Sequence, residues 1–115
     1  MVIISKSILN DFSQKHPDAE NALTKWYNEV KAADWGSFSD LKKTFNAADA
    51  VGNDRYVFDI RGNNYRLIAL IIFKKRTVFI LFVGTHQEYD KINAATISYK
   101  NRNYEIQYSI EKSIS

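Results

Sequence analysis

The apolar residues in the first half of the chain recur every three or four positions, which is the spacing of amphipathic helices. A short β-branched segment at 2–4 predicts a strand, and a first helix follows it and ends before His16-Pro17. Pro17 is well placed in the first turn of a second helix. The apolar stripe of that helix is formed by Leu23, Trp26, Tyr27 and Val30. A third, short helix is predicted from Ser37 or Ser39.

The hydrophobic period changes to two in the second half, which predicts β-structure. Residues 56–60 alternate, 61–64 form a turn, and 65–73 make a long apolar strand that ends in a basic turn at 74–76. The next strand, 77–83, is apolar on both faces and is therefore expected to be central, with helices on at least one side. The predicted fold class is α+β, with an N-terminal strand and helices packed on an antiparallel sheet.

A short helix is predicted directly after this central strand. Gly84 is expected to end the strand, and Thr85 and Glu88 have the spacing of a capping box. His86 then falls in the first turn, where free amides and the helix dipole favour an anion, and Tyr89 lies one turn later on the same side.

The C-terminal residues are harder to interpret. Residues 104–110 alternate between apolar and polar side chains, and 101–103 have the composition of a turn. A terminal hairpin and a mobile tail both fit this pattern. We therefore divide the chain into one domain at 1–95 and a C-terminal extension at 96–115.

Length and composition narrow the class of protein. With 115 residues, 45% of them hydrophobic and 14% aromatic, the chain suits a single folded domain. The absence of cysteine excludes a disulfide scaffold, a zinc-thiolate site and a cysteine nucleophile, and it fits a reducing compartment. The longest apolar run, 67–73, is far shorter than the roughly 20 residues that span a bilayer, and the N-terminus does not resemble a signal peptide. We expect a soluble, cytoplasmic protein without a membrane partner.

The net charge of +3 is mild, but its distribution is uneven. All five arginines lie in residues 51–115, and the segment 55–76 holds six basic residues against the single acid Asp59. The planar guanidinium contacts phosphate oxygens two at a time, so this clustering favours phosphate recognition. A solvated sheet face is the simpler alternative. If the cluster binds RNA, Arg66 and the turn at 74–76 are expected to share one RNA-contacting surface.

The available side chains restrict the possible chemistry. Metal catalysis is disfavoured because His16 and His86 are the only histidines and there is no thiol, and no cofactor is expected. Histidine, tyrosine and arginine suit metal-free phosphodiester transfer in RNA. In this hypothesis His86 moves a proton, and Arg66 and the basic turn at 74–76 offset the developing charge. Tyr89 positions or deprotonates the attacking hydroxyl, or stacks on a base.

Each of these residues also has a structural interpretation. A histidine at a helix start is more often a surface group than a catalyst, and an aromatic residue beside a strand end usually packs. Arg66 lies within an apolar run, so it must face water, pair with an acid such as Asp59, or serve a ligand. His16 is interpreted as a loop residue.

Several short motifs, in their order and spacing, resemble the HigB toxins, a branch of the RelE-like superfamily. The motifs are His16-Pro17-Asp18-Ala19-Glu20, Trp26-Tyr27-Asn28-Glu29-Val30, Ala33-Asp34-Trp35, Val51-Gly52-Asn53, Val57-Phe58-Asp59-Ile60, Gly62-Asn63-Asn64-Tyr65-Arg66-Leu67 and Phe82-Val83-Gly84-Thr85-His86-Gln87-Glu88-Tyr89-Asp90. The resemblance covers residues 1–93. Arg66 matches a strand arginine of the RelE pattern and Arg61 a basic position before it, whereas His86 stands where RelE has an arginine.

This resemblance implies a RelE-like fold and a small endoribonuclease toxin, an mRNA interferase, that cleaves messenger RNA on the ribosome. It also implies neutralisation by a HigA-like helix-turn-helix antitoxin, with operator DNA bound only through that antitoxin. The candidate catalytic residues are His86, Arg66 and Tyr89. The candidate RNA-binding residues are Arg61, Lys74, Lys75 and Arg76. Two alternatives remain open: a non-catalytic RNA- or ribosome-binding module of the same fold, and an antitoxin-binding remnant that has lost toxicity.

Overall fold

The structure, a computed structural model, describes residues 1–98. In chain order its elements are β1 (Val2–Ile4), α1 (Ser7–Lys15), the 3-10 turn η1 (Pro17–Ala19), α2 (Glu20–Ala32), α3 (Phe38–Thr44), β2 (Asp49–Gly52), β3 (Arg55–Ile60), β4 (Tyr65–Ile72), the 3-10 turn η2 (Phe73–Lys75), β5 (Thr77–Thr85) and α4 (His86–Asp90). Within the described residues, no helix is long and apolar enough to cross a membrane. The predicted hairpin at 101–110 lies outside the described residues, and the division at residues 95 and 96 stays a prediction.

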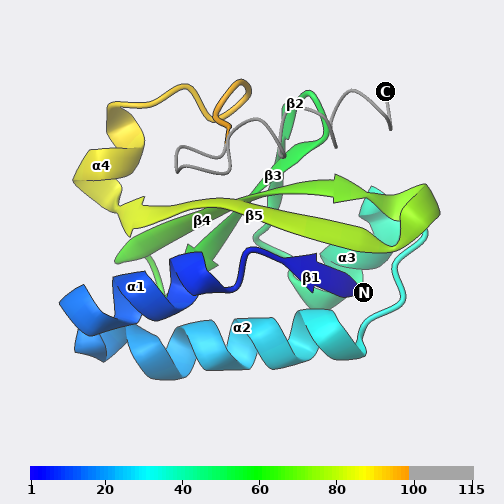
Figure 1. Ribbon diagram of the computed structural model, residues 1–115. Helices are drawn as coiled ribbons and strands as arrows, with labels where there is room; N and C mark the ends of the chain where they lie inside the picture. The colour runs from blue at the N-terminus through cyan, green and yellow to red at the C-terminus, as the bar shows by residue number, and fades with distance from the viewer. Residues whose placement is uncertain (99–115) are drawn as a thin grey trace.

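The strands form one sheet in the order β1-β5-β4-β3-β2. The pairs β2–β3, β3–β4 and β4–β5 are antiparallel, and β1 lies parallel to β5. In Figure 1, α1 and α2 lie together against one side of the sheet and α4 lies at the end of β5. The α+β prediction and the interior place of β5, between β1 and β4, are therefore confirmed.

Both faces of the sheet bury apolar side chains. This explains why apolar and polar residues do not alternate along β4 and β5. On one face, β3, β4 and β5 pack against the helices. The main contributors there are Leu23, Trp26, Val30, Phe58, Leu67, Ala69, Val78 and Ile80. The opposite face buries a second cluster that includes Ile68, Leu70, Phe79, Leu81 and Ile97. The segment after α4 therefore crosses this second face.

The helix boundaries follow local capping chemistry. Pro17 begins η1, a tight 3-10 turn, so α2 itself begins only at Glu20. Ser37 is the N-cap of α3, because its hydroxyl accepts a hydrogen bond from the Asp40 amide. The predicted basic turn is η2, which closes with Arg76 in the left-handed conformation at a φ of 50°.

Gly84 does not end the strand as predicted. It lies within β5, opposite Arg66 of β4, and β5 continues to Thr85. The reason for glycine is steric, since a Cβ at this position would lie 2.5 Å from Cζ of Phe82. A register shift in β5 places Leu81 and Phe82 toward the same face, so the Phe82 ring lies across Gly84.

We expect Gly84→Ala to destabilise the fold by about 1–3 kcal/mol, because the methyl group overlaps a packed ring. Denaturant unfolding measures the loss. In a Phe82→Leu background the same substitution should cost less, since the overlapping ring atom is gone. An equal cost in both backgrounds would show that the Phe82 contact is not the cause.

Candidate functional site

The three candidate catalytic residues come from neighbouring elements at one end of the sheet. Arg66 is the second residue of β4, and β5 runs antiparallel to it and leads directly into α4, which carries His86 and Tyr89. α4 packs against both strands. The Arg66 guanidinium carbon lies 5.9 Å from the centre of the Tyr89 ring, within the range of a cation–π interaction. The structure thus brings Arg66 and α4 together.

Arg66 pairs with an acid, one of the three alternatives that the sequence left open. Asp59 faces it across β3 and β4, and Nη1 of Arg66 lies 3.3 Å from Oδ1 of that carboxylate. Nη1 also donates to the carbonyl oxygens of Asn63 and Tyr65. The side chain is only 14% exposed. All three contacts are made by Nη1, so they orient the guanidinium group. Nη2 and Nε take no part in these three contacts.

His86 lies at the surface, with 49% of its side chain exposed. Its Nδ1 is 3.4 Å from Oδ2 of Asp90, one helical turn later. A carboxylate at Nδ1 favours the tautomer and ring orientation in which Nε2 is available to a substrate. The sequence analysis missed Asp90, although the i, i+4 spacing within the predicted helix was a usable signal.

The capping box of α4 is confirmed. The Thr85 hydroxyl accepts from the Glu88 amide at 3.1 Å, and the Glu88 carboxylate accepts from the Thr85 amide at 2.8 Å. This pairing uses one amide of the first turn and brings a carboxylate to the helix start. The start of α4 is therefore a weaker site for an anion than the sequence suggested. The capping box instead fixes the position of His86 directly after β5.

The basic turn lies far from these residues. Lys74 and Lys75 belong to η2, at the opposite end of β4 from Arg66. Six or more residues of extended strand separate them, which is about 20–25 Å. Arg76 is held in place, because its Nε lies 2.7 Å from Oδ1 of Asp34 and its Nη1 donates to the Phe73 carbonyl. Arg66 and this turn are therefore not adjacent, because the length of β4 lies between them. That they share one RNA-contacting surface stays a prediction.

Arg61 lies in the β3–β4 turn, at the same end of the sheet as Arg66. Its Nη1 is 3.1 Å from Oδ2 of Asp18, and the Tyr65 hydroxyl donates to Oδ1 of the same carboxylate at 2.7 Å. The His16 ring stacks on Phe12 with a centroid distance of 4.3 Å. This cluster ties the β3–β4 turn to η1 on the helix side of the sheet, and sequence reasoning did not find it.

The Asp18 contact makes the Tyr65 link pH-dependent. The hydrogen bond to Asp18, followed by burial, raises the pKa of Tyr65 above its ordinary value of 10.0. The protonated phenol is thus favoured in the folded state. Its hydrogen bond to Asp18 therefore stabilises the fold fully below pH 10, and this contribution is lost as the pH rises through the raised pKa of Tyr65.

We expect Tyr65→Phe to lower the melting temperature at pH 7, with the difference from the unsubstituted chain shrinking well above pH 10. Thermal unfolding at the two pH values measures this. A difference that stays constant across that range would contradict a role for the phenol proton.

Comparisons with known proteins extend over this whole site. Residues 19–92 match the HigB toxin family, described as the RelE-like toxic component of a toxin-antitoxin system. The chain belongs to this family. It is 34% identical over 94 residues to the mRNA interferase HigB of Escherichia coli O6:H1, which covers 80% of this chain and 91% of that relative. It is 29% identical over 96 residues to the mRNA interferase toxin HigB of Escherichia coli K12, covering 82% and 92%.

The HigB match includes the whole of β4, β5 and α4, and therefore every candidate site residue. The resemblance identified from the sequence motifs is confirmed.

Proposed function

We propose that this HigB-family chain is an mRNA interferase, an endoribonuclease that cleaves messenger RNA without a metal ion. The observation that supports the proposal most is the arrangement of Arg66, Tyr89 and His86 at one end of the sheet, in a chain whose relatives carry that activity in their names. These side chains provide a proton carrier, a fixed positive charge and a phenol.

The reaction that suits them is transesterification within the RNA. The 2′-oxygen forms a bond to phosphorus while the bond from phosphorus to the 5′-oxygen breaks. One proton leaves the 2′-hydroxyl and one proton must reach the 5′-oxygen of the departing strand. No oxidant, reductant or cofactor is needed, because two proton transfers and charge stabilisation balance the step.

His86 is proposed to carry one of these protons. Its Nδ1 faces Asp90, which leaves Nε2 for the RNA. Histidine is the side chain most often used for general acid–base catalysis, and the contact with Asp90 holds its ring in one orientation. Tyr89 is proposed to position the attacking hydroxyl, and its contact with Arg66 keeps the two side chains together.

Arg66 is proposed to stabilise the negative charge that builds up on the phosphate oxygens. A guanidinium that is already oriented by Asp59 and two backbone carbonyls needs little reorganisation when this charge develops. Asp59 has 38% of its side chain exposed, so solvent screens it and Arg66 keeps a large part of its attraction for phosphate.

The proposed biological setting is the cytoplasm, with messenger RNA cleaved on the ribosome. A HigA-like antitoxin with a helix-turn-helix DNA-binding part is the proposed neutralising partner, and operator DNA is contacted through that antitoxin alone. Expression of the chain should arrest growth, and co-expression of the antitoxin should restore it.

Purified protein incubated with messenger RNA, with and without ribosomes, tests the activity. Cleavage by the wild type and its loss in His86→Gln would support the proposal. Specific RNA binding without cleavage in both proteins would instead favour a non-catalytic RNA-binding module, and neither cleavage nor growth arrest would indicate an inactive antitoxin-binding remnant.

The basic turn is proposed to hold a more distant part of the RNA. Alanine at both Lys74 and Lys75 should weaken RNA binding and reduce the slope of log affinity against log salt by about 1–2, because phosphate contacts release counterions. Turnover of bound RNA should stay unchanged, since the turn lies far from Arg66. Alanine at both Lys15 and Lys31 removes the same charge from the helices and should leave the slope unaltered; equal effects of the two pairs would refute a specific contact.

A further inference from the structure

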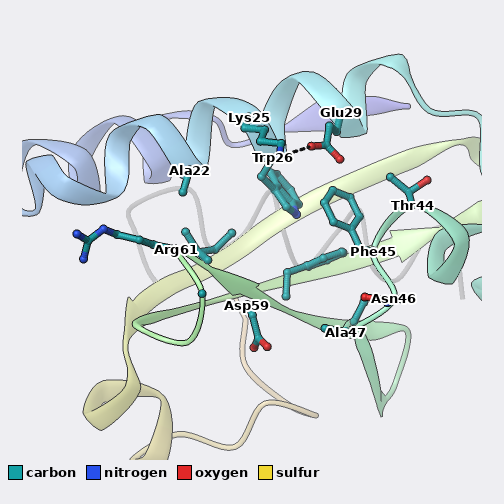
Figure 2. Close-up of a pocket in the computed structure, with 14 residues that line it drawn as sticks. Ala22, Lys25, Trp26, Glu29, Thr44, Phe45, Asn46, Ala47, Asp59 and Arg61 are labelled. Carbon is teal, nitrogen blue, oxygen red and sulfur yellow. Dashed lines mark ion pairs between the residues drawn. The ribbon is translucent and has the colours of Figure 1, made fainter.

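A groove separates α2 from the end of β3 on the helix side of the sheet. Its volume is about 420 Å³, which falls within the range of ligand pockets. Figure 2 shows Trp26 pointing from α2 toward Phe45, with Ala47 and Asn46 along the opposite rim. Lys42 steadies that rim, because its Nζ donates to the Ala48 carbonyl at 3.1 Å. The groove is thus bounded by fixed elements.

Among residues 1–98, no strand pairs with the edge of β3 that faces this groove. β2 pairs with β3 only as far as Asp49 opposite Val57, whereas β3 continues through Phe58 to Ile60. The backbone N–H and C=O groups of alternate strand residues point to opposite sides. At least one residue beyond Val57 therefore points its backbone groups toward the open edge, which is a template for an added strand.

Trp26 supplies a second, independent observation. The side chain is 3% exposed, yet its Nε1 has no hydrogen-bond acceptor among the described residues. The other tryptophan, Trp35, is bonded through its Nε1 to the Thr44 hydroxyl at 3.0 Å. A buried indole N–H usually has a partner, so Trp26 lacks an acceptor that a molecule in the groove could bring.

The charge of the groove favours a peptide over RNA. The charged residues of its lining are Lys25, Glu29, Asp59 and Arg61, but the Asp59 side chain points away from α2 and pairs with Arg66 (Figure 2). The other three charges are already paired. Lys25 lies 3.9 Å from Glu29, and Arg61 is already paired with Asp18. A polyanion gains little from such a surface, whereas a polypeptide can match both signs.

We infer that this groove binds an extended segment of the antitoxin, which pairs with the open edge of β3 and places an apolar side chain against Trp26 and Phe45. The inference rests on family membership and the groove itself, and it does not require the proposed cleavage. Main-chain hydrogen bonds supply affinity in such strand addition, and the side-chain pocket supplies specificity. Carbonyl groups of the added segment are the natural acceptors for the Trp26 indole.

The test fills the groove without changing its charge. Ala22→Gln and Ala47→Gln, made together, extend side chains into it from both rims. Binding to the antitoxin encoded with this chain, measured by calorimetry on the full-length proteins, should weaken at least about tenfold. Thr24→Gln is the matched control, because Thr24 lies on the same helix and lines the separate groove between α1 and α2. It should bind the antitoxin as the wild type does.

The two indole N–H signals provide a readout that does not depend on a substitution. In ¹⁵N-labelled toxin, addition of the antitoxin should move the Trp26 signal to a hydrogen-bonded position, while the Trp35 signal, already bonded to Thr44, should move little. The filled-groove variant should keep the melting temperature and RNA cleavage of the wild type, so loss of antitoxin binding is separable from failure of the cleavage proposal.

Several outcomes would overturn the inference. Wild-type affinity of the filled-groove variant for the antitoxin, or an unmoved Trp26 signal in the complex, would show that the segment binds elsewhere. Weaker RNA binding with unchanged antitoxin binding would assign the groove to RNA. A dimer of the isolated toxin that dissociates on filling the groove would assign it to a second copy of the chain.

Discussion

Replacement of His86 with glutamine is expected to slow RNA cleavage about 10²- to 10⁴-fold, the usual contribution of one general acid or base. Glutamine keeps hydrogen bonding but cannot shuttle a proton near neutral pH. The melting temperature and antitoxin binding should stay close to wild type, because the His86 side chain is 49% exposed and contributes little packing. Single-turnover cleavage of a defined messenger RNA measures the effect.

The matched control is His16→Gln. It makes the same chemical change at the other histidine, which stacks on Phe12 on the helix side of the sheet. We expect it to leave the cleavage rate unchanged. If His86→Gln cleaves within a few-fold of the wild type, His86 only positions the phosphate, and the proton-transfer role passes to Tyr89 or to the ribosome.

Alanine at Arg66 is expected to reduce turnover about 10²- to 10³-fold, comparable to the loss of one donor that stabilises a developing oxyanion. The larger part of the loss should fall on turnover, with a smaller part on RNA binding, because the interaction strengthens as charge builds up on the phosphate. The fold should survive, since Asp59 remains exposed enough to be hydrated once its partner is removed.

Arg66→Lys refines this test. Lysine retains the charge but not the planar fork, so partial recovery of turnover would indicate that charge matters more than bidentate geometry. Lys91→Ala is the control for net charge, because Lys91 is exposed at the end of α4 and has no proposed role. Full turnover in Arg66→Ala would show that the residue is purely structural.

The fold was largely predictable because its signals are local. The apolar stripe of α2 predicts a helix. The alternation of apolar and polar residues in β3 and the apolar runs of β4 and β5 predict strands. β2 (Asp49–Gly52) was not predicted, since it is short, mostly exposed and has no alternating pattern. The predicted strand end at Gly84 was also wrong. Glycine is required there because the Phe82 ring leaves no room for a Cβ, and not because the backbone turns at this position.

The site was predictable only where sequence neighbours define it. The capping box fixed His86 and Tyr89 on one helix, and burial cost correctly limited Arg66 to a few environments, of which pairing with Asp59 is the observed one. Contacts between distant residues were not accessible. The Asp18 cluster joins η1 to the β3–β4 turn across more than 40 positions, and the separation of the basic turn from Arg66 depends on strand geometry.

The chemical identity of the RNA ends tests the central claim most directly. Attack by the 2′-hydroxyl, with proton transfer by side chains, leaves a 5′-hydroxyl on one fragment and a 2′,3′-cyclic phosphate, or the 3′-phosphate formed from it, on the other. The account predicts these ends in the products of the purified toxin, at a rate that falls sharply in His86→Gln. A 5′-phosphate and a 3′-hydroxyl would contradict it, because those ends require attack by water and departure of the 3′-oxygen.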